Sequence, residues 1–155
     1  MKLLVVGSVN LDFVITAKSL PAPGETVTGG AFTTTPGGKG ANQALAARRL
    51  GADVTLCARV GTDAYAQAAL SNLHADGVDL SAVSRSETAP TGAAFIVVAG
   101  DGENQIAVAS GANHELAPAH VPDCAADAVL AQLETPQAAT LKAVENRDVF
   151  FALNA

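Results

Sequence analysis

The sequence predicts an α/β protein in which a mostly parallel sheet lies between two layers of helices (α/β/α), with a small β-sheet lid attached. Short apolar runs rich in Val and Leu recur along the 155 residues, and such runs are typical of strands buried on both faces of a parallel sheet. Segments with helical periodicity alternate with these runs. Other segments, rich in Thr and Gly, have the composition of exposed strands and predict the lid.

The first elements of this pattern lie before residue 61. Residues 2–6 form an apolar run that we expect to be a central strand, whereas residues 13–16 and 25–35 are expected to be exposed lid strands. An Ala-rich helix is predicted over residues 40–50. Residues 53–60 return to the strand pattern. The order strand, helix, strand is that of a right-handed α/β layer.

The middle of the chain predicts a second helix and then a hairpin. Thr62 can cap the helix, which is expected to end near Gly77. Apolar residues recur along it at i, i+3, i+4 and i+7; they are Ala66, Ala69, Leu70 and Leu73. Residues 91–98 and 104–109 have strand composition, and the Gly-Asp-Gly at residues 100–102 favours a tight turn between them. This hairpin is expected to join the lid.

The last part of the chain predicts a helix over residues 118–126, a buried strand over 128–133, a helix over 136–144 and another buried strand over 148–153. A parallel sheet that finished on such a strand would have an uncovered edge. We therefore expect that residues 1–155 are the N-terminal part of a longer α/β domain, so that the predicted fold is incomplete.

Composition and charge narrow the classes of partner. Hydrophobic residues make up 49% of the chain and charged residues 15%, which is typical of a globular protein. The net charge is −6 and no basic cluster is longer than Arg48-Arg49, so nucleic acid and anionic membranes are not expected partners. The apolar stretch after Met1 ends at Gly7, too early for a signal peptide or a membrane span. We expect a cytoplasmic protein that binds a small polar ligand.

The cysteines and histidines do not predict a metal site. Cys57 and Cys124 lack the spacing of a zinc or redox motif, so both are expected to be reduced structural residues. The three histidines are scattered, with no pair at i, i+4; they are His74, His114 and His120.

A glycine-rich segment at residues 36–43 leads directly into the predicted first helix. Such a turn can bring backbone close to a ligand, and the first N–H groups of a helix are free to bind it. The segment lacks the glycine and hydroxyl spacing of a phosphate-binding loop, and the turn after residues 2–6 lacks the glycines of a dinucleotide fingerprint. The alternative is a turn that is needed only for close packing.

Polar side chains follow two of the predicted buried strands. Asn10 and Asp12 come after the first strand, two residues apart, so in an extended segment they point to the same side. Glu134 follows the strand at 128–133. Carboxylate and amide groups at the carboxyl edge of an open sheet suit the hydroxyls of a sugar. The alternatives are an Asx turn for the first pair and, for the second segment, a helix cap by Thr135 before Pro136.

Taken together, Asn10-Leu11-Asp12, the Gly-Gly-Lys-Gly-Ala-Asn of residues 37–42 and the Glu-Thr-Pro of residues 134–136 resemble the ribokinase-like, or phosphofructokinase-B type, family of carbohydrate kinases. Residues 21–26 and 111–113 are also similar to this family, so the resemblance covers the whole chain. It implies that these three segments line a sugar pocket through Asn10, Leu11, Asp12, Gly38, Lys39, Gly40, Ala41, Asn42 and Glu134.

The resemblance also implies an activity. It implies ATP-dependent phosphorylation of D-ribose at O5, with ATP and Mg²⁺ as cofactors and a monovalent cation as a further candidate. The strands within 13–35 and 91–109 would form a lid over the sugar and pair two subunits in a homodimer. The family's Gly-Ala-Gly-Asp segment, which carries its catalytic Asp, does not occur in the 155 residues. The ATP and metal sites are likewise expected elsewhere, so this stretch alone is expected to be inactive.

Two alternatives stay open. Within the family, the chain could belong to a related nucleoside or hexose kinase, because the same groups recognise hydroxyls that many sugars share. Outside it, a short protein could bind sugar or dimerise without catalysis.

Overall fold

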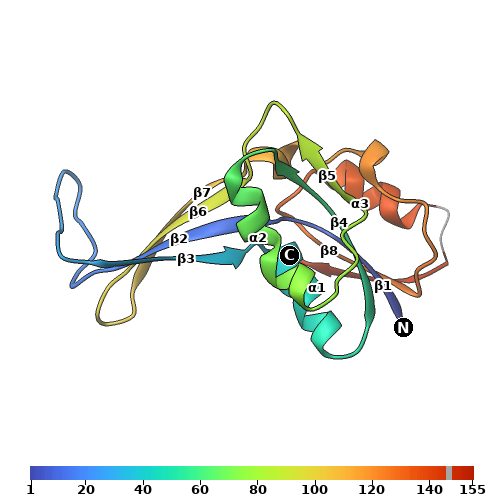
Figure 1. The fold of residues 1–155 in the computed structure, drawn as a ribbon, viewed down its shortest axis with the longest axis horizontal. Helices are drawn as coiled ribbons and strands as arrows, with labels where there is room; N and C mark the ends of the chain where they lie inside the picture. The colour runs from blue at the N-terminus through green and yellow to red at the C-terminus, as the bar shows by residue number, and fades with distance from the viewer. Residues whose placement is uncertain (146–147) are drawn as a thin grey trace.

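The computed structural model describes residues 1–145 and 148–155, which form two sheets (Figure 1). The larger sheet is parallel throughout, with strand order β5-β4-β1-β8-β9. Its strands are β1 (Lys2–Val6), β4 (Asp53–Gly61), β5 (Val83–Ser86), β8 (Ala128–Gln132) and β9 (Phe150–Asn154). The smaller sheet, called here the lid sheet, has the order β3-β2-β6-β7. Its strands are β2 (Asn10–Thr16), β3 (Ala31–Gly37), β6 (Gly92–Val98) and β7 (Asn104–Ala109).

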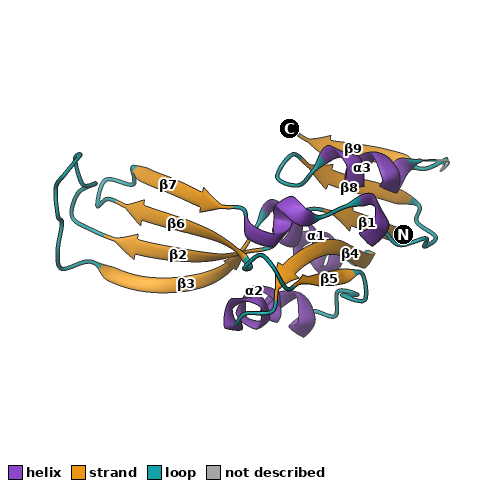
Figure 2. Cartoon of the chain, turned by 90° about the horizontal axis from the view of Figure 1, so that it is seen from above, coloured by secondary structure: helices purple, strands orange, loops and turns teal. Residues whose placement is uncertain are grey.

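Helices cover the parallel sheet on both faces (Figure 2). They are α1 (Lys39–Arg49), α2 (Ala64–Ala75) and α3 (Gln137–Val144), with short 3-10 turns η1 (Gly111–Glu115) and η2 (Pro118–His120). Successive side chains of a strand point to opposite faces, so β1 contributes Leu3 and Val5 to the core under α1 and α2. Leu4 and Val6 belong to the second core, under α3. The predicted α/β/α layers with β1 at the centre are confirmed.

The chain passes from the parallel sheet into the lid sheet within a few residues. β1 ends at Val6 and β2 begins at Asn10. β2 pairs with β3 in antiparallel and with β6 in parallel register, and β6 and β7 form the predicted hairpin. The lid sheet therefore projects from the carboxyl edge of the parallel sheet (Figure 2).

The second helix begins one residue later than predicted. Asp63, not Thr62, caps it, because the Asp63 carboxylate accepts hydrogen bonds from the N–H groups of Tyr65 and Ala66 at 2.9 and 3.2 Å. Both residue types are good caps, and the sequence pattern alone did not separate them. The apolar face of the helix is buried as predicted.

Three other expectations were wrong in extent or in burial. Residues 118–126 do not form a helix: only the turn η2 forms, and Pro122 could not have continued a helix because it lacks an N–H group. The strand predicted at 25–35 begins only at Ala31. The last strand forms as β9, at the edge of the sheet beside β8, but none of its side chains is fully buried. β5 and η1 were not predicted.

Cys57 lies in the second core, where Cys124 packs against it. Burial, followed by the proximity of Cys124, raises the pKa of Cys57 to about 12, so this thiol is not a reactive nucleophile. Among residues 1–145 and 148–155, no helix is long and apolar enough to cross a membrane.

Candidate functional site

The predicted site residues meet at the carboxyl edge of the parallel sheet. β1 and β8 are parallel neighbours, with Val6 opposite Ala131, so the segments that follow both strands lie at the same edge. The first leads through Ser8 to β2, and the second carries Glu134. The glycine-rich segment between β3 and α1 reaches the same place, because backbone groups of α1 bond to Ser8.

The start of α1 is packed directly on the turn after β1. The N–H of Ala41 donates to the Ser8 carbonyl at 2.9 Å, and the N–H of Gly40 donates to Ser8 Oγ at 3.3 Å. A Cβ atom on Gly40 would lie 2.5 Å from the carbonyl carbon of Gly7. The packing alternative therefore explains Gly40, whose side-chain space is filled by the protein itself.

Glu134 is held in a fixed position by three donors. Its carboxylate accepts from Ser8 Oγ at 2.6 Å and from the Lys39 N–H at 3.3 Å, and Lys39 Nζ lies 3.4 Å away. Burial raises the pKa of Glu134, but the hydrogen bonds from Ser8 and Lys39 outweigh it and lower the pKa overall. The Lys39 side chain is 54% exposed, so its ion pair contributes only about 0–1 kcal/mol. Glu134 is therefore an ionised acceptor at neutral pH.

The helix-cap alternative for this segment is wrong. Pro136 occupies the N-cap position of α3, with no side-chain cap hydrogen bond. The Thr135 hydroxyl is buried and has no hydrogen-bond partner among the described residues. Glu134 is thus available to the site rather than being part of a cap.

Asp12 has a buried acceptor atom that lacks a hydrogen-bond donor among the described residues. Burial, followed by the negative charge of Glu134, raises its pKa. Its Oδ1 atom is buried and has no hydrogen-bond partner within the described part of the chain. Its carboxylate also fills the side-chain space of Gly37, where a Cβ atom would lie 2.2 Å from Oδ2. A buried acceptor without a donor is costly, and a ligand hydroxyl would satisfy it.

Asn10 lies within β2 rather than in an Asx turn, so the turn alternative is wrong. It is 6% exposed, and its Oδ1 accepts a hydrogen bond from Asn113 Nδ2 at 2.8 Å. The period of a strand places Asn10 and Asp12 on one face of the lid sheet. Ser8 and Asn113 were not among the predicted site residues; the only sequence signal for Asn113 was the Gly-Ala-Asn of residues 111–113.

The remaining predicted residues have different roles. Leu11 and Ala41 are 3% and 4% exposed and belong to the core under α1 and α2, so their side chains do not face a ligand. Asn42 is exposed on the first turn of α1. The Gly38 backbone has a φ angle of 92°, which favours glycine, and a Cβ there would lie 2.8 Å from the Ser8 carbonyl oxygen.

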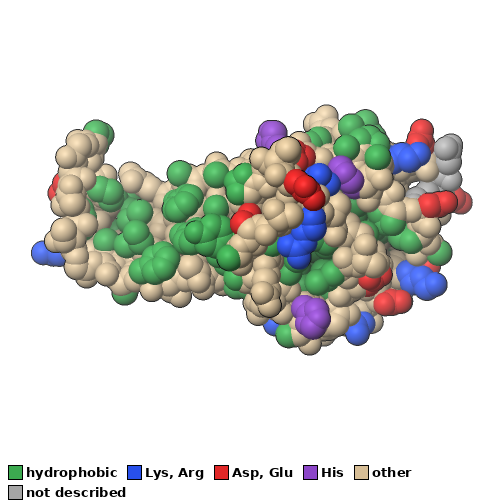
Figure 3. Space-filling view, turned by 45° about the horizontal axis from the view of Figure 1, so that its top comes forward, with side chains coloured by type: hydrophobic (Ala, Val, Ile, Leu, Met, Phe, Trp, Pro, Cys, Tyr) green, Lys and Arg blue, Asp and Glu red, His purple; other side chains and the backbone are tan. Residues whose placement is uncertain are grey.

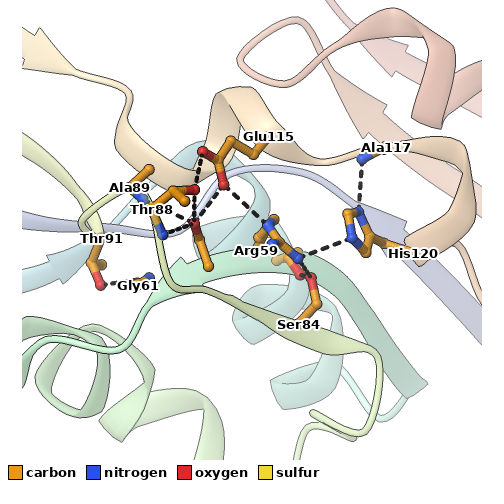
Figure 4. A network of polar contacts seen from close by, with 11 residues as sticks. Arg59, Gly61, Ser84, Thr88, Ala89, Thr91, Glu115, Ala117 and His120 are labelled. Atoms are coloured by element: carbon orange, nitrogen blue, oxygen red, sulfur yellow. Dashed lines mark hydrogen bonds and ion pairs between the residues drawn. The ribbon is translucent and has the colours of Figure 1, made fainter.

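A polar network fixes η1 against the parallel sheet (Figure 4). Glu115 accepts hydrogen bonds from Ser86 Oγ, from Thr88 Oγ1 at 2.9 Å and from Arg59 Nε at 3.5 Å. Arg59 Nη1 also lies 2.9 Å from His120 Nε2 of η2. The hydrogen bonds from Ser86 and then Thr88 lower the pKa of Glu115. The network joins both 3-10 turns to β4 and β5 and so determines where Asn113 lies.

Residues 1–147 match the family model described as pfkB family carbohydrate kinase. The chain belongs to this family. The predicted family resemblance is confirmed.

Relatives in this family include kinases for two related sugars. A ribokinase of Bacillus subtilis (strain 168) is 44% identical over 138 residues, which are 86% of this chain and 47% of the relative. A deoxyribokinase of Salmonella typhi is 35% identical over 133 residues, which are 86% of this chain and 44% of the relative. The chain spans about half the length of the curated relatives it matches.

Solved structures of ribokinases have the same fold. That of Thermotoga maritima superimposes with a TM-score of 0.86 at 31% identity, covering 97% of this chain and 51% of the other. The Arabidopsis thaliana ribokinase complexed with ribose and ATP gives 0.82 at 33% identity, covering 99% and 53%. These pfkB-family structures confirm the α/β fold with its smaller second sheet.

A groove of about 660 Å³ lies between α2 and β5, and two charged groups that line it, Asp63 and Arg85, already bond to backbone groups of the protein. The carboxylate of Asp63 accepts from three backbone N–H groups, including that of Thr91 at 2.7 Å. Arg85 donates to the Gly61 carbonyl at 3.0 Å. At the carboxyl edge, by contrast, Asp12 Oδ1, Gln132 Oε1 and Thr135 Oγ1 are buried without a hydrogen-bond partner among the described residues, so we take this edge as the candidate functional site.

Proposed function

We propose that the complete protein is an ATP-dependent ribokinase that phosphorylates D-ribose at O5, and that this chain supplies its sugar-recognition part. One observation supports this most strongly: the Asp12 and Glu134 carboxylates and the Asn10 amide converge at the carboxyl edge, and Asp12 Oδ1 is a buried acceptor without a donor. Family membership and the ribokinase relatives support the same reading.

The groups of the site match the chemistry of a sugar. An ionised carboxylate only accepts hydrogen bonds, and vicinal hydroxyls can donate to it. Glu134 is held ionised by Ser8 and Lys39, while Asp12 lacks a donor. The proposed binding set is Asn10, Leu11, Asp12, Gly38, Lys39, Gly40, Ala41, Asn42 and Glu134, with Leu11 and Ala41 supporting the site from the core.

The lid sheet would cover the bound sugar. Asp12 is opposite Ala94 in the pairing of β2 with β6, and Ala94 is opposite Val108 in the hairpin. Directly opposite residues share a face, so an apolar surface continues outward from Asp12. Movement of this surface toward the sugar would exclude water from a reacting phosphoryl group. We therefore assign the lid to the strands within 13–35 and 91–109.

The proposal assigns recognition, and not phosphoryl transfer, to these residues. The described residues contain no group of three His, Cys, Asp or Glu side chains that could hold a metal ion. The resemblance associates catalysis with a Gly-Ala-Gly-Asp segment, which the 155 residues do not include. ATP, Mg²⁺ and a monovalent cation enter the proposal only as cofactors of the complete protein.

We also propose that the complete protein is a homodimer that pairs through the lid sheet. Hydrophobic side chains gather along this sheet (Figure 3). Ile106 and Val108 are each more than half exposed on the face of the sheet that carries Asp12, and Phe32 and Phe95 are each more than half exposed on the opposite face. Exposed apolar side chains of this kind are typical of an interface. Light scattering should give a dimer mass, and Phe95→Lys or Ile106→Lys should give a monomer; a wild-type monomer would contradict the pairing.

The experiment for the main proposal compares sugars on the complete protein. Binding and ATP-dependent phosphorylation of ribose, deoxyribose, fructose and adenosine are measured side by side. A site that binds a hydroxyl rejects the analogue that lacks it, because a buried acceptor is then left unpaired. Ribose should be preferred. A preference for deoxyribose, which the deoxyribokinase relative makes a specific alternative, or for a hexose or nucleoside would replace ribose as the substrate. Sugar binding without phosphorylation would support a non-catalytic protein.

A further inference from the structure

The turn η1 carries Asn113, whose buried side chain contacts the candidate site at Val9 and Asn10. Asn113 is 2% exposed, and its side chain makes three hydrogen bonds, to Val9 just before β2 and to Asn10 at the start of β2. Its Oδ1 accepts from the Val9 N–H at 2.9 Å. Its Nδ2 donates to the Val9 carbonyl at 3.1 Å and to Asn10 Oδ1 at 2.8 Å. Every hydrogen-bonding direction of this amide except one lone pair is used.

These bonds determine which way both amides face. A backbone N–H can only donate and a backbone carbonyl can only accept, so Val9 fixes the orientation of the Asn113 amide. The Asn113 amide nitrogen is therefore the atom that faces Asn10, and it can be met only by the Asn10 oxygen. It follows that Asn10 Nδ2 points away from Asn113. Among the described residues, no hydrogen bond from Asn10 Nδ2 is formed.

The surroundings leave room for this pair of amides and no more. Gly92 lies opposite Asn10 in the pairing of β2 with β6. A Cβ atom on Gly92 would lie 2.2 Å from Asn10 Oδ1 and 2.3 Å from Asn113 Nδ2. The Glu115 hydrogen bonds described above fix η1 two residues further along the chain (Figure 4). The contact between the two amides is therefore enclosed on several sides by fixed backbone.

We infer that Asn113 is a positioning residue for sugar recognition: it holds the Asn10 amide so that Nδ2 is offered to the ligand as a hydrogen-bond donor. This inference rests on the proposed sugar-binding function. The two carboxylates of the site only accept hydrogen bonds, whereas a sugar hydroxyl both donates and accepts. A fixed donor beside two fixed acceptors matches both roles. A flipped Asn10 would instead place a third acceptor near Asp12 and Glu134.

The test is Asn113→Asp in the complete protein, a change that keeps the shape of the side chain. One carboxylate oxygen can still accept from Val9 N–H, but the other would face two acceptors, the Val9 carbonyl and Asn10 Oδ1. Rotation of the Asn10 amide relieves the second conflict and turns the donor away from the sugar. The dissociation constant for ribose should rise on the order of tenfold to hundredfold. Asn72→Asp, the same chemical change on the exposed side of α2, should leave it within about twofold.

A double-mutant cycle separates positioning from general damage. In an Asn10→Ala background, Asn113→Asp should weaken ribose binding by no more than about twofold further, because the group on which it acts is gone. If Asn113→Asp weakens binding as strongly without the Asn10 amide as with it, Asn113 acts on the site as a whole and the inference is overturned.

A measurement on the wild-type protein needs no variant to fold. With asparagine labelled by ¹⁵N, the Asn113 NH₂ group should exchange slowly with water in the absence of ligand, and the Asn10 NH₂ group should exchange rapidly. Ribose should slow the exchange of Asn10. A slowly exchanging Asn10 NH₂ that ribose does not affect would overturn the inference. If the amides behave as expected but no sugar binds, the orientation stands and the proposed function fails.

Discussion

Replacing Gly40 with alanine tests whether the glycine-rich segment is packed as tightly as the structure indicates. The added Cβ would lie 2.5 Å from the Gly7 carbonyl carbon and 2.6 Å from the Ser8 nitrogen, where ordinary contact begins at 3.4 Å. All of these atoms are backbone, so they cannot move aside as a flexible side chain would. The two segments would have to separate by roughly 0.9 Å, because overpacked atoms are relieved only by such shifts.

That separation would also break hydrogen bonds. The Ala41 N–H donates to the Ser8 carbonyl at 2.9 Å and the Gly40 N–H to Ser8 Oγ at 3.3 Å, and both would lengthen beyond hydrogen-bond range. Overpacking costs about 1–3 kcal/mol and an unsatisfied buried donor about 1–3 kcal/mol, against a gain of about 0.5–1 kcal/mol from alanine in a helix. We expect Gly40→Ala to lower the free energy of unfolding by about 2 kcal/mol or more.

The measurement is urea unfolding of the complete protein followed by circular dichroism, together with calorimetry of ribose binding. Gly100→Ala is the matched control, because the nearest atom to its Cβ would be the Lys18 carbonyl oxygen at 3.7 Å, an ordinary contact. The control should stay within about 0.5 kcal/mol of the wild type. If Gly40→Ala has the same urea midpoint and ribose affinity as Gly100→Ala, the packing of α1 on the turn after β1 is not as described.

Three further predictions concern the acidic groups of the site. Asp12→Asn should raise the thermal midpoint at neutral pH and weaken ribose binding. Burial and the charge of Glu134 raise the pKa of Asp12, so ionisation of Asp12 costs stability as the pH rises. The gain in thermal midpoint should disappear in acid, where Asp12 is protonated in both the folded and the unfolded state. Protonation of Asp12 in acid should weaken ribose binding. Glu134→Gln removes the neighbouring charge and should lower the pKa of Asp12, so in a calorimetric titration this loss of ribose affinity should occur at lower pH than in the wild type. Ser8→Ala should raise the pKa of Glu134, leave the Gly40 N–H without its acceptor and cost about 1–3 kcal/mol in urea unfolding; an unchanged midpoint would contradict that role.

The layers of the fold could be predicted because they depend on local composition. The run at residues 2–6 is apolar at every position after Lys2, which only a strand covered on both faces can bury. β9 has an equally apolar sequence, but Phe150 is 72% exposed. Composition indicates that a strand can be buried, whereas actual burial depends on which elements pack against it. β5 gave no clear signal for a different reason: it is a four-residue edge strand with three polar residues and no apolar run.

The site was predicted in part for a similar reason. Asp12 and Glu134 could be placed together because the carboxyl ends of neighbouring parallel strands meet at one edge. Ser8 and Asn113 were missed because their roles depend on distant partners. Ser8 bonds to Glu134, 126 residues away, and Asn113 bonds to Val9, 104 residues away. A serine after a strand and an asparagine in a short turn have many local explanations, and only the tertiary contacts choose between them.

The structure also separates two kinds of residue within the site, and they should respond differently to substitution. Gly40 and Ser8 fill packing positions or complete hydrogen bonds within the protein, so changing them should lower stability and sugar affinity together. Asp12 carries a costly acceptor that the protein leaves without a donor, so changing it should raise stability while affinity falls. A ligand-binding group should show this combination of higher stability and lower affinity on substitution, because a residue with a purely structural role is expected to stabilise the fold. If Asp12→Asn lowered stability and affinity together, Asp12 would have to be counted with the packing residues, and the argument for a ligand hydroxyl at its Oδ1 atom would fail.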